Sequence, residues 1–166
     1  MLRRQEFLRD DFAERLLGRL AGNGIAPARI VVEVGESVLQ ARGATHVLRA
    51  MRELKAAGVR VVLDGFGIGQ SSLAQLRDCP VDGLKIDRSL VFDMLSDPHS
   101  LAVIRTICTL GSQLGLALVG VGVETEEQAR LLQEAGCGLA QGRLYGMAER
   151  DVDLVGIMAR GVRPAS

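Results

Sequence analysis

The chain has 166 residues, a length that suits one domain with a substantial core. Hydrophobic residues make up 48% of the sequence, and 20 basic residues balance 20 acidic ones, as is typical of soluble globular proteins. The zero net charge provides no general attraction to nucleic acid or anionic membranes, and the aromatic content of 3% offers few stacking platforms for single strands. We therefore expect neither a nucleic-acid partner nor a membrane partner.

The N-terminal segment carries too many charges for a signal peptide, and no apolar run reaches membrane-spanning length. The three cysteines, Cys79, Cys108 and Cys137, are far apart and form no CxxC pair, which argues against a zinc site or a disulfide framework. We expect buried free thiols in a reducing compartment, and a cytoplasmic protein.

Helical and strand-like segments alternate along the chain. The first is an expected amphipathic helix, ended by Gly22 and Gly24, with apolar residues at helical spacing at Leu8, Phe12, Leu16, Leu17 and Leu20. Short apolar segments predict strands at 29–34, 59–64, 83–87 and 116–121, with a less well-marked fifth at 138–142. Helical patterns fill 37–57, 71–77, a run to 114 that is broken near Asp97 and Pro98, 126–135 and 152–159. The alternation predicts an α/β fold of parallel βα units, and the order alone does not choose a barrel over an open sheet.

Polar side chains stand at the ends of the predicted strands. In chain order they are Glu33, Asp64, Lys85, Asp87, Glu124 and Gln141. In parallel α/β folds the carboxyl ends of the strands form the functional site. The two-residue period puts Lys85 and Asp87 on one face of their strand, where an unpaired charge is costly to bury. We therefore expect these residues to gather at one edge of the sheet.

Asp64 also has a local interpretation, as the cap of the helix that follows it. The segment VVLDGFGIGQSSL contains GFGIG, which is not GxGxxG, and no GK[ST] follows, so a nucleotide-binding fingerprint is not indicated. GVGVE at 120–124 is equally unspecific. His46 and His99 lie away from the predicted strand ends, and we expect surface or packing roles for both.

Three long segments resemble the EAL domain of bacterial cyclic di-GMP phosphodiesterases. VEVGESVL is similar to the family's LELTESVL, and LDGFGIGQSSLAQLRDCPVDGLKIDRSLV to its DDFGTGYSSLxxLxxLPVDxLKIDRSFV. LVGVGVETEEQARLLQEAGCGLAQGRLYG is similar to VVAEGVETxxQxxxLxxxGCDxxQGYLFx. The resemblance implies a TIM-type (β/α) barrel, here partial with about five parallel strands, and a single truncated EAL-like domain over residues 1–166.

The family cleaves the cyclic dinucleotide with two Mg²⁺ or Mn²⁺ ions, which carboxylates hold and which activate a water molecule. Carried over position by position, the resemblance implies metal ligands at Glu33 and Asp64. It places Lys85 near the catalytic water, with Asp87 as its partner. It also implies that Glu36 braces the glycine loop and that Glu124 and Gln141 line the site. Lys85 and Glu124 are then the candidate catalytic residues, and Glu36, Asp87 and Gln141 the candidate substrate-binding residues.

The chain departs from the family pattern at several of its chemical positions. Gly65 stands where the family has the second Asp of the DD pair, and Val121 where it has a Glu proposed as general base. Gly35, Arg143 and Ala148 replace a Thr, a Tyr and a Pro, and the EAL tripeptide is absent. We expect about three of the eight barrel strands to be missing on the N-terminal side.

Gly65 and Val121 offer no side-chain ligands, so too few carboxylates remain to neutralise two dications. Loss of a metal ligand or a base commonly costs roughly 10²-fold or more. We predict a catalytically inactive, degenerate domain without tightly bound Mg²⁺ or Mn²⁺. We expect it to act as a signalling or protein-interaction module in cyclic di-GMP pathways and to bind cyclic di-GMP weakly at most. Two alternatives stay open: an active metal-dependent phosphodiesterase that hydrolyses the cyclic dinucleotide to the linear form, and a remnant without function.

About five parallel strands cannot close an eight-stranded barrel, so two sheet edges and an apolar inner face would be exposed. We therefore predict self-association or a protein partner, with the strand at 29–34 as the seam.

Overall fold

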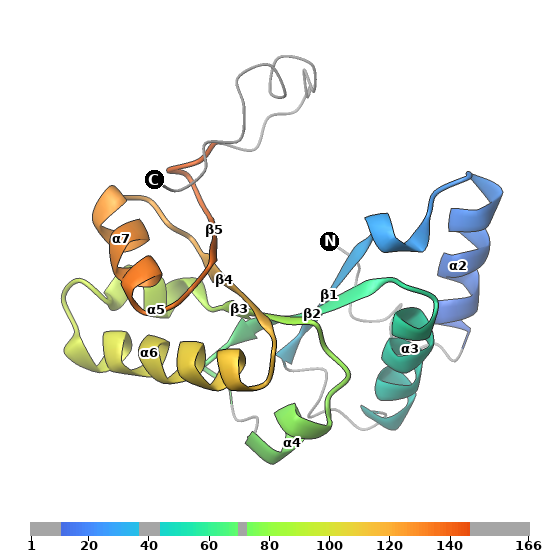
Figure 1. The fold of residues 1–166 in the computed structure, drawn as a ribbon, viewed down its shortest axis with the longest axis horizontal. Helices are drawn as coiled ribbons and strands as arrows, with labels where there is room; N and C mark the ends of the chain where they lie inside the picture. The colour runs from blue at the N-terminus through green and yellow to red at the C-terminus, as the bar shows by residue number, and fades with distance from the viewer. Residues whose placement is uncertain (1–10, 37–43, 70–72, 147–166) are drawn as a thin grey trace.

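The computed structural model describes residues 11–36, 44–69 and 73–146, in which strands and helices alternate (Figure 1). The strands are β1 (Val31–Gly35), β2 (Arg60–Phe66), β3 (Gly83–Ile86), β4 (Ala117–Val121) and β5 (Leu139–Gln141). They form one sheet in the order β1-β2-β3-β4-β5, and each neighbouring pair is parallel. The prediction of parallel βα units is confirmed.

Helices connect the strands on the outer side of a curved sheet. The helix α2 (Phe12–Gly22) and a 3₁₀ turn (Pro27–Arg29) precede β1, and the later helices are α3 (Ala44–Ala56), α4 (Leu73–Asp78), α5 (Arg88–Asp93), α6 (Pro98–Gln113) and α7 (Glu126–Glu134). Figure 1 shows α2 and α3 near the β1 end, α4 beneath the middle of the sheet, and α5, α6 and α7 near the β5 end. The sheet therefore resembles part of a barrel wall, with β1 and β5 at its two edges.

Several element boundaries differ from the sequence prediction. The strand predicted from residue 29 begins at Val31, because Pro27–Arg29 forms the 3₁₀ turn. Helix α2 includes Gly22 and ends at the cap residue Asn23, so Gly22 does not stop it. The helix predicted at 152–159, and the predicted helix starts at Leu8, Ser37 and Ser71, lie outside the described residues.

The largest difference concerns β2, which runs past Asp64 to Phe66. Its pairing with β3 shifts register between Leu63 and Phe66, and Gly65 adopts a φ of 74° inside this irregularity. Glycine takes that left-handed conformation without the steric penalty that a Cβ causes. Asp64 is thus a residue of β2, nine positions before Leu73, the first residue of α4. Its interpretation as the cap of that helix stays a prediction, because residues 70–72 lie outside the described part of the chain.

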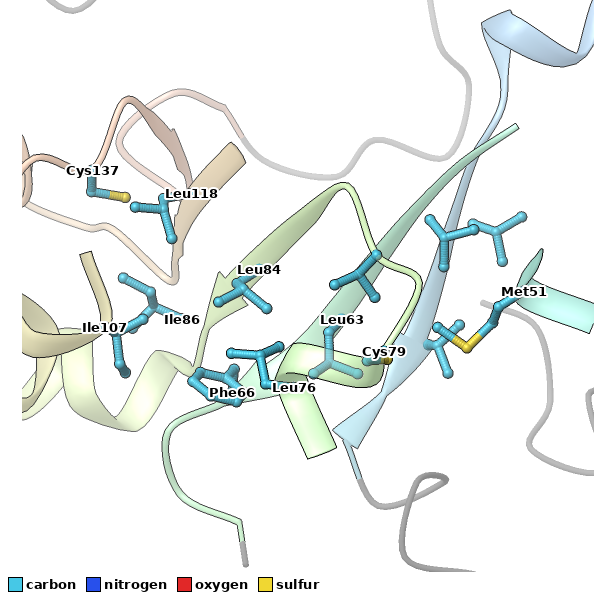
Figure 2. Close-up of a cluster of buried hydrophobic side chains, with 14 of the residues drawn as sticks. Met51, Leu63, Phe66, Leu76, Cys79, Leu84, Ile86, Ile107, Leu118 and Cys137 are labelled. Carbon is cyan, nitrogen blue, oxygen red and sulfur yellow. The ribbon is translucent and has the colours of Figure 1, made fainter. Parts of the chain in front are cut away.

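The hydrophobic core lies between the outer face of the sheet and the helices. In β1, Val32 and Val34 are buried whereas Val31, Glu33 and Gly35 are exposed, as the two-residue period requires. Figure 2 shows the continuation of this core through the other strands and helices, with Met51, Leu63, Phe66, Leu76, Cys79, Leu84, Ile86, Ile107, Leu118 and Cys137 labelled. Full burial of one such apolar side chain contributes about 1.5–3 kcal/mol. This packing fixes the strands whose carboxyl ends carry the polar residues.

Side-chain caps begin three of the helices. Asp87 accepts a hydrogen bond from the backbone of Ser89 in α5, and Asp97 accepts from the backbones of His99 and Ser100 in α6. Thr125 and Gln128 form a reciprocal capping box at the start of α7. The predicted break near Asp97 and Pro98 is confirmed, because Asp97 caps α6.

Three further predictions concern single residues and the chain as a whole. Cys79, Cys108 and Cys137 are buried free thiols, and His46 and His99 are exposed, as expected. Among the described residues, none of the helices has the length and apolar character needed to cross a bilayer.

Candidate functional site

Lys85 lies at the centre of an acid–lysine cluster that consists of Glu33, Asp64 and Lys85. Its ammonium Nζ is 2.7 Å from Oε1 of Glu33 and 4.0 Å from Oδ1 of Asp64. The lysine side chain is only 8% exposed, whereas those of Glu33 and Asp64 are 49% and 35% exposed. The cluster therefore holds one buried cation between two solvent-accessible acids.

Strand register explains why these three residues meet. Glu33 and Gly83 both pair with Val62 on β2, and Asp64 and Lys85 each lie two residues further along their strands. All three side chains therefore point to the same face of neighbouring strands. This is the inner face, opposite the buried Val34, Leu63 and Leu84.

Asp87 does not extend the cluster as a strand residue. β3 ends at Ile86, and the Asp87 carboxylate accepts hydrogen bonds from the backbone N–H and the hydroxyl of Ser89, both at 2.8 Å. The prediction that Asp87 shares a strand face with Lys85 was therefore wrong, because Asp87 already belongs to the cap of α5. Its Oδ2 nevertheless lies close to β2, since a Cβ built on Gly65 would be 3.6 Å from it.

Glu36 follows β1 and is buried beneath the glycine loop after β2. A Cβ built on Gly69 would lie 2.4 Å from the carboxyl carbon of Glu36, so no larger residue fits at position 69 without a shift. This contact agrees with the bracing position that the resemblance implies. The role itself stays a prediction, and residues 70–72 of the loop lie outside the described part of the chain.

The remaining candidates lie at the ends of β4 and β5. The Arg143 guanidinium donates to Oε1 of Glu124, with Nε at 3.0 Å and Nη2 as a second contact. The backbone oxygen of Gln141 accepts from the N–H groups of Gly122 and Val123, and its side chain is exposed. Arg143 was expected only as a substitution of the family's Tyr, and its ion pair with Glu124 was not predicted, because neither spacing nor pattern provides a signal for it.

The acids of this region are spread over several strand ends in the described part of the chain. Within residues 11–36, 44–69 and 73–146, no three His, Cys, Asp or Glu side chains come together as a metal site. Glu33 and Asp64 share one ammonium, and Glu124 contacts a guanidinium. A dication requires several oxygen ligands around one point, and here the nearby charges that neutralise the acids are basic side chains.

Comparisons with known proteins identify the family. The EAL domain family model matches residues 1–148. MucR of Pseudomonas aeruginosa, described as a bifunctional diguanylate cyclase/cyclic di-GMP phosphodiesterase, is 35% identical over 141 residues, which cover 85% of this chain and 20% of MucR. The MucR phosphodiesterase in complex with cyclic di-GMP superposes with a TM-score of 0.82 at 34% identity, over 88% of this chain and 59% of that one.

Two further solved structures are similar. The EAL domain of Mycobacterium smegmatis DcpA has a TM-score of 0.84 at 35% identity, over 93% of this chain and 69% of that one. Klebsiella pneumoniae BlrP1 in its manganese and cyclic di-GMP complex has a TM-score of 0.76 at 29% identity, over 82% and 35%. The chain spans about a fifth of the length of the first curated relatives that it matches.

The chain belongs to the EAL domain family, and its sheet is part of the TIM-type barrel of that family. The resemblance drawn from the sequence is thereby confirmed. Divalent metal and cyclic di-GMP are present in solved structures of relatives.

Proposed function

We propose that this chain is a degenerate EAL domain that does not hydrolyse cyclic di-GMP and serves as a signalling or protein-interaction module in cyclic di-GMP pathways. The observation that carries the proposal is the loss of two carboxylates beside the acid–lysine cluster, in which the Lys85 ammonium lies 2.7 Å from Glu33 and 4.0 Å from Asp64. The two acids that would complete a metal site are replaced by Gly65 and Val121.

Charge decides between this proposal and an active enzyme. Two divalent ions bring four positive charges, and the phosphate of the substrate offsets little of that charge. Lys85 offsets one of the two negative charges of Glu33 and Asp64, and Arg143 contacts Glu124. The net charge that the site retains for a metal is therefore small, which argues against tight binding of Mg²⁺ or Mn²⁺ at this edge of the sheet.

A titration with Mn²⁺ tests the metal part of the proposal. We expect no saturable heat from the wild-type chain in a calorimeter, and a measurable gain of affinity in the variant Gly65→Asp/Val121→Glu, which restores the two carboxylates. Gly65→Ala/Val121→Ala is the matched control, because it replaces the same two residues and also places a Cβ at position 65, but adds no carboxylate. Saturable binding of Mn²⁺ to the wild-type chain would contradict the proposal.

Protein interaction is the role that the sheet edges support. β1 and β5 are the two edges of the sheet formed by the described residues, and Val31 of β1 and Leu139 of β5 are 45% and 56% exposed. An open strand edge beside exposed apolar side chains favours pairing with another strand. We therefore propose self-association through β1.

Light scattering after size exclusion measures this association. We expect the wild-type chain to form a species larger than the monomer, and Val31→Lys to shift it toward the monomer, because a charged edge residue opposes strand pairing. Val103→Lys, on an exposed position of α6, is the control and should leave the mass unchanged. A folded wild-type protein that stays monomeric over the accessible concentration range would refute the β1 seam.

A further inference from the structure

Asn23 is the only asparagine in the sequence, and a glycine, Gly24, follows it. The pair lies in the turn after α2, where both residues are exposed. Gly24 has a φ of 66°, a left-handed conformation that glycine adopts without the steric penalty of a Cβ. A backbone nitrogen that no side chain of its own residue shields therefore follows directly on a side-chain amide, and this order of groups allows the nitrogen to attack the amide carbon.

Backbone hydrogen bonds close this turn as a Schellman motif. The N–H of Ile25 donates to the backbone oxygen of Leu20 at 2.9 Å, and the N–H of Gly24 donates to that of Ala21 at 3.1 Å. The nitrogen that could attack the Asn23 amide is thus bound to a carbonyl of the last turn of α2.

The side chain of Asn23 is held by the same turn. Its Nδ2 donates to the backbone oxygen of Arg19 at 2.7 Å. The ψ of Asn23 is 7°, which turns the Gly24 nitrogen toward the backbone nitrogen of Asn23 and away from its side chain. In the folded conformation the Gly24 nitrogen therefore does not face the Cγ atom, and the two atoms meet only when the end of the helix opens.

We propose that Asn23 is a deamidation site whose rate is controlled by fraying of the last turn of α2. Helix ends open locally at a lower free-energy cost than the whole fold. Opening frees the Gly24 N–H and the Asn23 amide together, because carbonyls of one turn bind both groups. The modification then occurs in the native protein, in proportion to the fraction of molecules whose helix end is open.

The reaction uses water as its only co-reactant. Hydroxide takes the proton from the Gly24 nitrogen, which forms a bond to Cγ of Asn23, and the bond from Cγ to Nδ2 breaks. Ammonia leaves with a proton from water, hydroxide is regenerated, and a succinimide ring remains. Water then opens the ring. Cleavage of the bond from the Gly24 nitrogen to Cγ gives aspartate, and cleavage of its bond to the backbone carbonyl carbon gives isoaspartate.

Either product weakens the end of α2. A carboxylate at position 23 cannot donate to the Arg19 oxygen, and its negative charge lies beside the negative end of the helix dipole. Isoaspartate also lengthens the main chain, which changes the spacing on which the hydrogen bonds of Gly24 and Ile25 depend. Because Leu20 of the last turn is buried in the core, deamidation loosens the segment that joins α2 to the edge strand β1.

Incubation of the purified full chain at mildly alkaline pH, followed by peptide mass spectrometry, tests the proposal. We expect aspartate and isoaspartate at position 23, with the mass change of amide-to-acid conversion and release of ammonia. The Asp–Gly pairs at 64–65 and 82–83 also have the order of groups that forms a succinimide, but they lose and regain water, so they change neither the mass nor the ammonia. In denaturant we expect the conversion to be roughly tenfold faster or more, because the hydrogen bonds of the turn are open there.

Two alanine variants separate control by the last turn from general stability of α2. Gly22→Ala lies in the last turn and Gly18→Ala one turn earlier, and at both exposed positions a Cβ meets no heavy atom within 4 Å. Because alanine favours the helix more than glycine does, we expect Gly22→Ala to slow the native reaction by roughly 2–5-fold and Gly18→Ala to leave it unchanged. The rate of each variant in denaturant corrects for any direct effect of the substitution on the chemistry.

Three results would overturn the proposal. They are an Asn23 that stays intact in native buffer while the denatured chain converts, equal rates in native buffer and denaturant, and equal slowing by Gly22→Ala and Gly18→Ala. Asn23→Asp tests the consequence, and we expect its melting temperature to be lower than that of the wild-type chain by roughly 2–4 °C. An Asn23→Asp variant as stable as the wild-type chain would show that deamidation does not loosen α2.

Discussion

Lys85 and Glu33 form an ion pair whose two partners differ in exposure, and this difference predicts unequal effects of mutation. Glu33→Gln leaves a buried ammonium with only the more distant Asp64 for compensation, and we expect it to lower the free energy of unfolding by about 1–3 kcal/mol. Lys85→Met leaves two acids that water already reaches, and we expect a change within about 1 kcal/mol.

Urea unfolding of the two variants and the wild-type chain measures the comparison. If Lys85→Met lowers the free energy of unfolding more than Glu33→Gln does, the prediction is contradicted. The contacts that Lys85 makes would then contribute more to stability than the cost of burying its ammonium without Glu33.

Asp97 predicts a pH dependence of stability. The Ser100 hydroxyl and the His99 backbone N–H, in that order, hold the pKa of Asp97 below its ordinary value. The folded pKa is therefore lower than the unfolded one, so the stabilisation is present above the unfolded pKa and is lost as the pH falls through the folded pKa.

We expect Asp97→Ala to be less stable than the wild-type chain at neutral pH, and the difference in melting temperature to shrink as the solution is acidified. Melting curves over a pH series check it. A difference that is the same at neutral and strongly acidic pH would mean that the carboxylate charge is not what caps α6.

At the residue scale, the residues that could be predicted from the sequence are those whose position at a strand end carried the information. Glu33, Asp64 and Lys85 were expected at one edge of the sheet, and the structure brings them together. Prediction failed where a partner lies far along the chain, as for Arg143 and Glu124, because spacing does not show which opposite charges meet. It also failed for Asp87, since a cap and a strand end look alike in sequence.

At the scale of elements, the β4 and β5 ends are held together by a backbone contact that only glycine permits. A Cβ on Gly142 would lie 2.0 Å from the Val123 backbone oxygen and 2.3 Å from its nitrogen. We expect Gly142→Ala to destabilise the fold by about 1–3 kcal/mol or more, because backbone on both sides must shift.

Gly138→Ala is the matched control in the same region, since a Cβ there meets no heavy atom within 4 Å. Chemical unfolding of both variants measures the effect. Equal stabilities for the two variants would show that the approach of Gly142 to Val123 is not a constraint on the fold.

The five strands and their parallel order followed from apolar segments that alternate with helical patterns. Their boundaries were less accessible, because the irregularity at Gly65 carries β2 past Asp64 to Phe66. That register shift depends on pairing with β3 and on the positive φ of Gly65. The sequence contains many glycines, and it does not show which of them adopts a positive φ within a strand.

At the scale of the whole molecule, alternation alone did not distinguish an open sheet from part of a barrel. The family motifs supplied the barrel, and the curved five-stranded sheet with helices on its outer side agrees with them (Figure 1). One charge contact at the strand ends departs from the family motif, because Arg143 stands where the motif has a Tyr and its guanidinium contacts Glu124.

Incubation of the purified chain with cyclic di-GMP and Mn²⁺, followed by chromatographic separation of the linear product, tests the central claim most directly. The MucR phosphodiesterase serves as the positive control. We predict no linear product above the level of a sample without protein, because positions 65 and 121 lack carboxylates and Arg143 contacts Glu124. Steady, Mn²⁺-dependent formation of the linear dinucleotide would contradict the account and make the chain a phosphodiesterase.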